Sequence, residues 1–155
     1  MISGGCQCGA VRYRCESVSK ASICHCRMCQ KAFGGFYAPL VTSNNLQWNR
    51  GVPKYFKSSD KVTRGFCADC GTPLTYDWGG EVEIAIATLD DPTQAPPVTQ
   101  VNITDKLDFV DQLHKLPVRQ NSSGETSFMV DLQSYQHPDH DTDQWPQPNS
   151  MKSSI

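Results

Sequence analysis

The stretch GGCQCGAVRYRC at residues 4–15 decides the fold, because it sets two cysteines one residue apart directly before an alternating segment. Val11, Tyr13 and Cys15 fall on one side of that segment and two arginines fall on the other, which is the period-two pattern of a half-buried strand. Near neighbours in a strand make poor disulfide partners, since a disulfide requires a particular Cβ separation and dihedral angle. The two thiols therefore predict a bond to a partner other than each other.

The chain has eight cysteines among its 155 residues, and seven of them fall in three tight groups. The groups are CQC (Cys6, Cys8), CHCRMC (Cys24, Cys26, Cys29) and CADC (Cys67, Cys70). Disulfide frameworks scatter half-cystines across loops, whereas metal sites cluster them so that each turn delivers two sulfurs to one ion. The clustering favours metal binding. A thiol–disulfide redox protein is an alternative, because two C-x-x-C pairs are present.

The CADCG turn at residues 67–71 has the spacing of a zinc knuckle. Zinc takes four ligands in a tetrahedron at about 2.3 Å from each sulfur, and the glycine lets the backbone fold back beneath the metal. The CQCG stretch at residues 6–9 is the natural donor of the other two sulfurs. We therefore expect a closed structural zinc site formed by Cys6, Cys8, Cys67 and Cys70.

The group of Cys24, Cys26 and Cys29 has three sulfurs with no obvious fourth cysteine. Zinc held by three ligands with one open position is the arrangement of a catalytic site. Three thiolates make zinc a weak Lewis acid that suits another soft sulfur ligand, so the sequence predicts a thiol substrate bound as its thiolate. A closed structural site is the alternative, with a fourth donor from Cys15, His25, His114, His137 or His140.

Two of these fourth donors are disfavoured by their local sequence. Cys15 shares the buried alternation of Val11 and Tyr13, which indicates a core thiol. His25 lies between two expected ligands and would point away from the ion. For the reaction itself, the candidates for a proton donor or anion clamp are Lys31, Arg64 and Tyr37.

The rest of the body reads as short strands joined by turns. Strands are expected at residues 8–15, 22–24, 36–42, 54–57, 62–66, 74–78, 82–86 and 98–104, and short helices at residues 27–33 and 108–116. Gly79-Gly80 predicts a hairpin, whereas Pro39 predicts an edge or a bulge in its strand. Turn residues surround Leu46 and Trp48.

Charge and composition limit the partners. The chain carries 14 basic and 16 acidic residues, a net charge of -2, and no basic stripe interleaved with aromatics, so no nucleic acid partner is expected. Its start, MISGGCQC, has neither a positively charged nor an apolar signal region, and no apolar run reaches the length of a membrane span. We expect a soluble cytoplasmic protein without a membrane partner, and a homodimer is compatible with the sequence.

The composition changes near residue 120. Residues 1–120 are expected to form the zinc-binding domain, and residues 121–155 a polar C-terminal extension that is partly flexible. The stretch FMVDLQSY at residues 128–135 is the exception in this extension, because its apolar residues can add an edge strand or dock on the surface.

Four motifs together resemble the glutathione-dependent formaldehyde-activating enzyme family, which also includes centromere protein V. They are G-C-x-C-G-x-V-x-Y at the start, C-H-C-x-x-C followed by K-A-F-G-G, F-C-x-x-C-G-T-x-L, and L-D-D-P after the β-rich part. The resemblance runs from about residue 4 to residue 119, where DQLHKLP is similar to the family's last short segment. Phe109 stands where members often have a tryptophan.

The resemblance implies a mainly β, zinc-bound fold with short helices and two zinc ions per chain. It implies that the sulfurs of Cys6, Cys8, Cys67 and Cys70 hold structural zinc and those of Cys24, Cys26 and Cys29 hold catalytic zinc. The implied activity is that of a carbon–sulfur lyase, which joins a glutathione-like thiol and a small aldehyde such as formaldehyde into an S-hydroxymethyl adduct, or cleaves it. The competing interpretation is a non-catalytic zinc-binding module that recognises a protein or nucleic acid.

Overall fold

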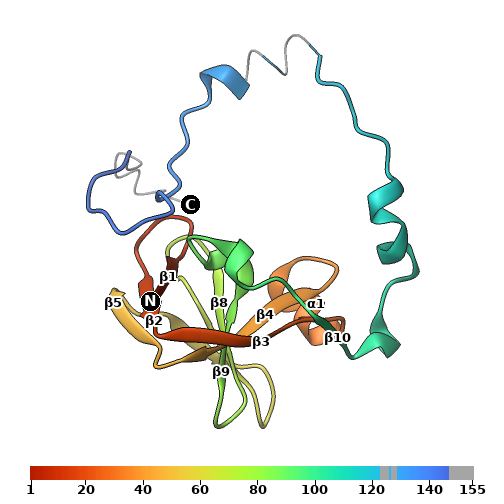
Figure 1. Ribbon diagram of the computed structural model, residues 1–155, viewed down its shortest axis with the longest axis horizontal. Coiled ribbons are helices and arrows are strands. Elements are labelled where there is room, and N and C mark those ends of the chain that lie inside the picture. The colour runs from red at the N-terminus through yellow and green to blue at the C-terminus, as the bar shows by residue number, and fades with distance from the viewer. Residues whose placement is uncertain (123–125, 127–128, 147–155) are drawn as a thin grey trace, which may run out of the picture.

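The computed structural model describes residues 1–122, 126 and 129–146, and its body is built from two β-sheets (Figure 1). The smaller sheet has the strand order β1-β2-β5, and the larger has the order β10-β3-β4-β9-β8-β7-β6. The fold is therefore mainly β with short helices, as the sequence predicts. The strands are β1 (Ile2–Gly5), β2 (Arg12–Cys15), β3 (Ser17–Cys24), β4 (Ala38–Asn44), β5 (Gln47–Arg50), β6 (Lys54–Lys57), β7 (Thr63–Phe66), β8 (Pro73–Asp77), β9 (Val82–Ala85) and β10 (Thr99–Val101).

The smaller sheet confirms the alternation in the opening stretch. Val11, Tyr13 and Cys15 are buried, while Arg14 is exposed. The Tyr13 ring packs edge-on against Trp48 of β5, with 5.8 Å between the ring centroids. Cys15 is thus a core thiol, as its place in the pattern predicts.

This sheet also differs from the prediction, because the strand expected at residues 8–15 forms only at residues 12–15 and β1 was not expected. Residues 47–50 form the strand β5 beside β2, although the sequence predicts only turns around them. Arg12, expected on the solvent face, is 2% exposed because two carboxylates, those of Asp90 and Asp141, pair with its guanidinium. Alternation within one strand cannot report partners that come from elsewhere in the chain.

The larger sheet contains the predicted hairpin of β8 and β9, in which Thr75 pairs with Ile84 and Asp77 with Val82. Pairing is antiparallel throughout this sheet except between β10 and β3. Pro39 lies in β4 between two other strands, yet the β9 ladder begins only at Leu40. The proline therefore occupies a local edge, where its missing N–H is tolerated.

A short helix of about two turns, α1 (Arg27–Phe33), follows β3 over the predicted residues. Its N-cap is Cys26, whose sulfur accepts a hydrogen bond from the Cys29 backbone N–H at 3.4 Å. Gly34 ends the helix in the left-handed conformation at φ 61°. The other helices are of the 3-10 type: η1 (Ile86–Thr88), η2 (Pro92–Gln94), η3 (Ile103–Asp105) and η4 (Asp108–Lys115).

The C-terminal segment leaves the body after η4 and returns to it. Figure 1 shows the segment passing away from α1 and coming back beside the loop between β1 and β2. The His137 backbone N–H donates to the Gln7 carbonyl at 2.8 Å, and the His137 side chain is buried. Of the stretch expected to add a strand or dock, residue 128 lies outside the described residues and residues 129–131 are helical and exposed.

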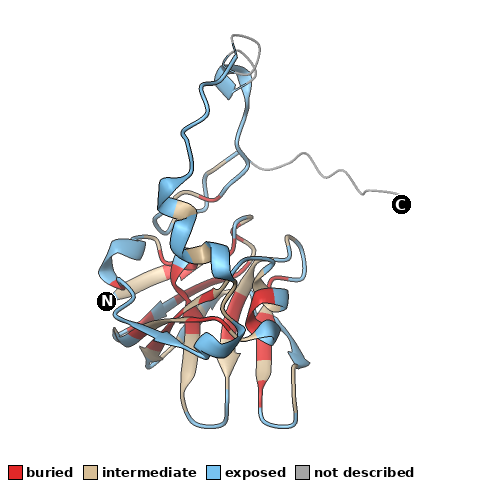
Figure 2. Ribbon diagram, turned by 90° about the vertical axis from the view of Figure 1, so that its right-hand side faces the viewer, coloured by how far each residue is buried: buried red, intermediate tan, exposed pale blue. Residues whose placement is uncertain are grey.

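Burial is concentrated in the two sheets, whereas most of the described C-terminal segment is exposed (Figure 2). The main core cluster includes Cys6 and Cys67 together with Tyr13 and Leu74. A smaller cluster contains Cys24 and Cys29 with neighbours from β4. Within the described part of the chain, no helix has the length and apolar character needed to cross a membrane.

Candidate metal centres

The first cysteine group brings together two turns that are about 60 residues apart in sequence. The sulfurs of Cys6, Cys8, Cys67 and Cys70 lie within 4.8 Å of one another. Cys8 Sγ is 3.6 Å from Cys6 Sγ and 3.8 Å from Cys67 Sγ. Such spacing is that of ligands around one tetrahedral ion.

Each turn is closed by a glycine that no other residue replaces without strain. Gly9 has φ +76° and donates to the Cys6 carbonyl, while Gly71 has φ +77° and donates to the Cys67 carbonyl. The Val11 backbone N–H also donates to Cys6 Sγ at 3.3 Å. These hydrogen bonds position the sulfurs without the help of an ion.

Thiol ionisation at this group is unequal. Burial raises the pKa of Cys8 above its ordinary range and the pKa of Cys67 to about 11. Burial also opposes ionisation of Cys70, but hydrogen bonds from Thr72 and Cys8 outweigh it and lower the pKa of Cys70 to about 6. Since one thiolate suppresses ionisation of its neighbours, four thiolates require a cation among them, and the all-sulfur donor set fits zinc.

The second group lies at the end of β3 and the start of α1, where the sulfurs of Cys24, Cys26 and Cys29 are within 4.8 Å of one another. Cys29 is 1% exposed and Cys24 7% exposed. Two side chains from distant segments donate to these sulfurs. Asn102 Nδ2 lies 3.2 Å from Cys24 Sγ, and Arg64 Nη2 lies 3.2 Å from Cys29 Sγ.

Ionisation is unequal here as well. The hydrogen bond from Cys29, helped by that from Asn102, lowers the pKa of Cys24 to about 5. The same hydrogen bond to Cys24, together with burial, raises the pKa of Cys29, although Arg64 opposes that rise. The three sulfurs can therefore all be thiolates only with a cation between them, so this group also fits a thiophilic metal.

No fourth ligand completes this group within the described residues, where only the three cysteines gather. Cys15 belongs to the main core cluster, and His25 Nε2 donates to Gln100 Oε1 at 3.0 Å. His114 is exposed on η4 and His140 is exposed in the C-terminal segment. His137 is buried, but beside the first group rather than the second.

Of the three candidates for a proton donor or anion clamp, the structure brings one to the sulfurs. Arg64 is 3% exposed, donates to Cys29, and has an Nη1 atom with no hydrogen-bond partner among the described residues. Lys31 is exposed on α1, and the Tyr37 ring packs edge-on against His25. Arg64 is the candidate whose geometry supports a role.

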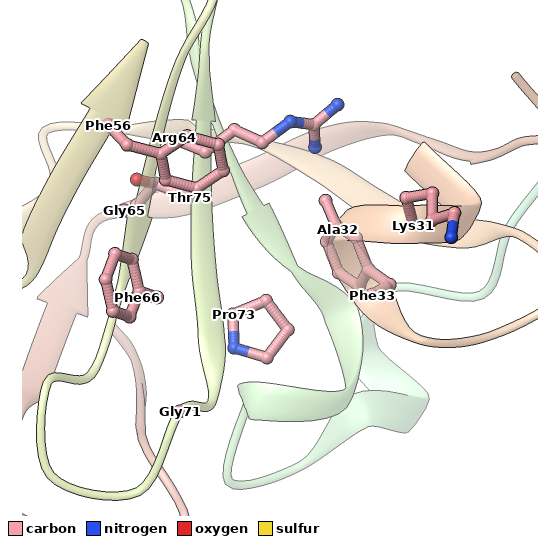
Figure 3. A pocket seen from close by; sticks show the side chains of 10 residues that line it. All are labelled: Lys31, Ala32, Phe33, Phe56, Arg64, Gly65, Phe66, Gly71, Pro73 and Thr75. Atoms are coloured by element: carbon pink, nitrogen blue, oxygen red, sulfur yellow. The ribbon is translucent and has the colours of Figure 1, made fainter. Parts of the chain in front are cut away.

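Two of the pockets near the second group differ in polarity. One, of about 220 Å³, is lined by both Cys24 and Cys29 and by the polar side chains of Ser22, Glu83 and Asn102. The other, of about 410 Å³, is mainly apolar and has Arg64 in its wall (Figure 3). The Arg64 guanidinium stacks over the Tyr76 ring at 4.8 Å.

Sequence reasoning missed Asn102 and Glu83. Asn102 lies inside the strand expected at residues 98–104, but it follows β10 with φ 54°, a left-handed conformation that asparagine tolerates, and no local pattern reported its sulfur contact. Glu83 lies in the alternating strand β9, where polar residues are ordinarily assigned to solvent. Burial, and then the charge of Cys24, raise the pKa of Glu83.

The C-terminal segment covers the first group. His137 contacts the Trp145 ring edge-on at 4.4 Å between centroids, and Arg50 stacks over the same Trp145 ring at 5.0 Å. Arg50 also donates to the Gly9 carbonyl at 3.2 Å and pairs with Asp143. A cluster of aromatic and charged side chains thus lies against the first cysteine turn.

Two comparisons with known proteins bear on these centres. The family model described as glutathione-dependent formaldehyde-activating enzyme matches residues 1–105 of the 155. A crystal structure of a Rhodobacter sphaeroides protein superposes with a TM-score of 0.50, over 64% of this chain and 99% of its own, at 22% sequence identity. At that identity the second comparison supports the fold alone. The family match ends at Asp105, the last residue of η3, so the similarity of DQLHKLP to the family's last segment stays a prediction.

Proposed function

The chain belongs to the glutathione-dependent formaldehyde-activating enzyme family, and from this premise we propose that it is a zinc-dependent carbon–sulfur lyase. Its substrates in this proposal are a glutathione-like thiol and an aldehyde, which it joins into an S-hydroxymethyl-type adduct or releases from one. The observation that carries the proposal is the inequality of the two cysteine groups, one with four sulfurs and one with three. A four-sulfur set closes the coordination of zinc, whereas a three-sulfur set leaves room for a substrate.

In this account Cys6, Cys8, Cys67 and Cys70 hold a structural zinc ion, and Cys24, Cys26 and Cys29 hold a catalytic one. When bound there, zinc supplies a coordination position at which a thiol loses its proton at neutral pH. The pocket lined by Cys24 and Cys29 offers hydrogen-bonding groups from Ser22, Glu83 and Asn102 for a polar thiol such as glutathione.

Arg64 has the geometry to assist the attack of the thiolate on the aldehyde carbon. Its Nη2 atom is committed to Cys29 Sγ, while Nη1 has no partner among the described residues. An unpaired buried N–H favours an oxygen that becomes negative during attack on a carbonyl carbon, because the donor gains a strong charge-assisted hydrogen bond. We assign Arg64 to stabilise the carbonyl oxygen as the carbon–sulfur bond forms.

The proposal also covers the domain boundaries of the chain and the cellular compartment in which it works. Residues 1–120 make up the zinc-binding domain, and residues 121–155 are a C-terminal extension whose described part includes the docked side chains around His137. The activity suits a cytoplasmic protein, because a reducing compartment keeps the thiols free to bind metal.

The experiment that tests the proposal compares Cys26→Ser with Cys67→Ser. We expect Cys26→Ser to lose activity in the condensation of glutathione with formaldehyde and to retain one zinc ion per chain with a nearly unchanged melting temperature. Cys67→Ser removes a ligand that belongs to the main core cluster, so we expect it to unfold the domain. Equal loss of zinc and stability in both variants, or a wild-type protein with full zinc and no acceleration, would favour a non-catalytic zinc-binding module.

A further inference from the structure

The pocket that has Arg64 in its wall is lined mainly by aromatic and apolar side chains. Figure 3 shows Ala32 and Phe33 on the α1 side facing Phe66 and Pro73 on the sheet side, where Phe56 also lies. Its volume of about 410 Å³ lies in the range of small-molecule sites, roughly 300–1,000 Å³. An apolar lining of this size binds a hydrocarbon group rather than a charged one.

Arg64 joins this pocket to the sulfurs. Its side chain is part of the pocket wall, while its Nη2 atom lies 3.2 Å from Cys29 Sγ. Tyr76, on which the guanidinium stacks, lines the smaller polar pocket instead. The stacked pair therefore lies where the polar pocket, which contacts Cys24 and Cys29, meets the apolar pocket that Arg64 lines.

We infer that the apolar pocket holds the hydrocarbon group of the aldehyde, so that the preferred electrophile is an aryl or branched-alkyl aldehyde rather than formaldehyde. The inference rests on the proposed function and adds the substrate class. The thiol sulfur bonds to the carbonyl carbon, the C=O π bond breaks, and the thiol proton ends on the carbonyl oxygen beside Arg64. The product is a hemithioacetal, and no oxidant or reductant is consumed.

The alternatives for this pocket fit its lining less well. Formaldehyde has two non-hydrogen atoms and would leave most of the volume without contacts. Glutathione carries two carboxylates and an ammonium group, and of the ten residues that line the pocket only Lys31 and Arg64 are charged. Burying glutathione there would leave its polar groups largely unpaired, at a cost of a few kcal/mol each.

The test uses the zinc-loaded full chain and a variant that fills the pocket. Ala32 lies on α1 and lines the pocket, so Ala32→Phe places a ring inside it, while Ala32→Ser is the control of similar size. We expect the wild type to have a higher kcat/KM for benzaldehyde than for formaldehyde, with glutathione as the thiol. In Ala32→Phe the ratio of these two values should fall at least tenfold, and in Ala32→Ser it should stay close to the wild-type ratio.

Binding of benzyl alcohol, an unreactive analogue, gives a second readout by ligand-observed NMR. We expect saturable binding to the wild type and its loss in Ala32→Phe, and Phe56→Ala should weaken it without filling the pocket. A ratio unaffected by Ala32→Phe, with formaldehyde turned over, would overturn the inference and leave the proposed function standing. The inference would also be overturned if Ala32→Phe lowered kcat/KM only for phenylmethanethiol with formaldehyde, a pair in which the thiol carries the aryl group. If benzyl alcohol binds as expected but no aldehyde is turned over, the pocket assignment is supported and the lyase proposal fails.

Discussion

Arg12 and Asp141 are 129 positions apart in the sequence and form an ion pair, with Arg12 Nη2 2.8 Å from Asp141 Oδ1. Asp90 takes the other side of the same guanidinium through hydrogen bonds of 2.7 and 2.6 Å. Because Arg12 is 2% exposed, these two carboxylates compensate its buried charge. The part of the C-terminal segment around Asp141 therefore belongs to the folded body.

Asp141→Ala should lower the free energy of unfolding by about 1 kcal/mol, because it removes hydrogen bonds to Arg12 and to the exposed Arg14 while Asp90 still neutralises Arg12. Urea denaturation measures the change. Asp139→Ala is the matched control, since Asp139 is exposed in the same segment and has no ion pair among the described residues. Equal stability of the two variants would show that the contact with Arg12 contributes nothing.

The same contact predicts a dependence on pH. Burial alone would raise the pKa of Asp141, but the hydrogen bonds from Arg12 and Arg14 outweigh it and lower the pKa to about 2. A carboxyl with a depressed folded pKa stabilises the protein above its unfolded value, about 3.9, and the contribution disappears as the pH falls toward 2. The stability difference between the wild type and Asp141→Asn should therefore be constant from pH 5 to 7 and shrink below pH 4. A difference that grows on acidification would contradict this.

Gly9 and Gly71 allow backbone strain to be separated from packing. Their φ angles are +76° and +77°, so alanine is strained at both by roughly 1 kcal/mol. A Cβ atom on Gly9 would lie 2.3 Å from His137 Cδ2, whereas nothing lies within 4 Å at Gly71. Gly9→Ala should thus cost about 1–3 kcal/mol more than Gly71→Ala in urea denaturation. Adding His137→Ala should reduce that excess, and an excess that persists would show that His137 is not its source.

Asn102→Ala should weaken zinc binding at the three-cysteine group about 10- to 100-fold, because Cys24 Sγ loses the hydrogen bond from Asn102 Nδ2. Competition with a chelator measures the affinity. Asn45→Ala is the control for the backbone, since Asn45 has nearly the same conformation, with φ of 52° against 54°. If both variants bind zinc equally, the contact with Cys24 does not support the ligand.

Much of the fold follows from local sequence patterns. Alternation predicted the buried face of β2, the glycine pair at 79–80 predicted the hairpin, and the lack of strand alternation at residues 27–33 before two glycines predicted α1. In each of these the determining residues are adjacent in the chain. The strand β5 was not predicted, because its polar residues are paired only through the distant strand β2.

The grouping of the cysteines could also be predicted, since each turn delivers its sulfurs locally. The side chains that support the sulfurs could not. Asn102 reaches Cys24 through the parallel pairing of β10 with β3, and Arg64 reaches Cys29 from a strand of the larger sheet. The place of His137 beside Gly9 depends likewise on contacts across most of the chain, and no local pattern reports them.

The absorption of cobalt-substituted protein tests the central claim most directly. With two Co²⁺ ions per chain, titration with glutathione should change the spectrum of one ion saturably and leave the other unchanged, because only the three-sulfur group can accept another ligand. Cys26→Ser, loaded with cobalt at the four-sulfur group, should show no change. A wild-type spectrum that glutathione does not alter, or a single metal ion per chain under metal-replete conditions, would contradict the account.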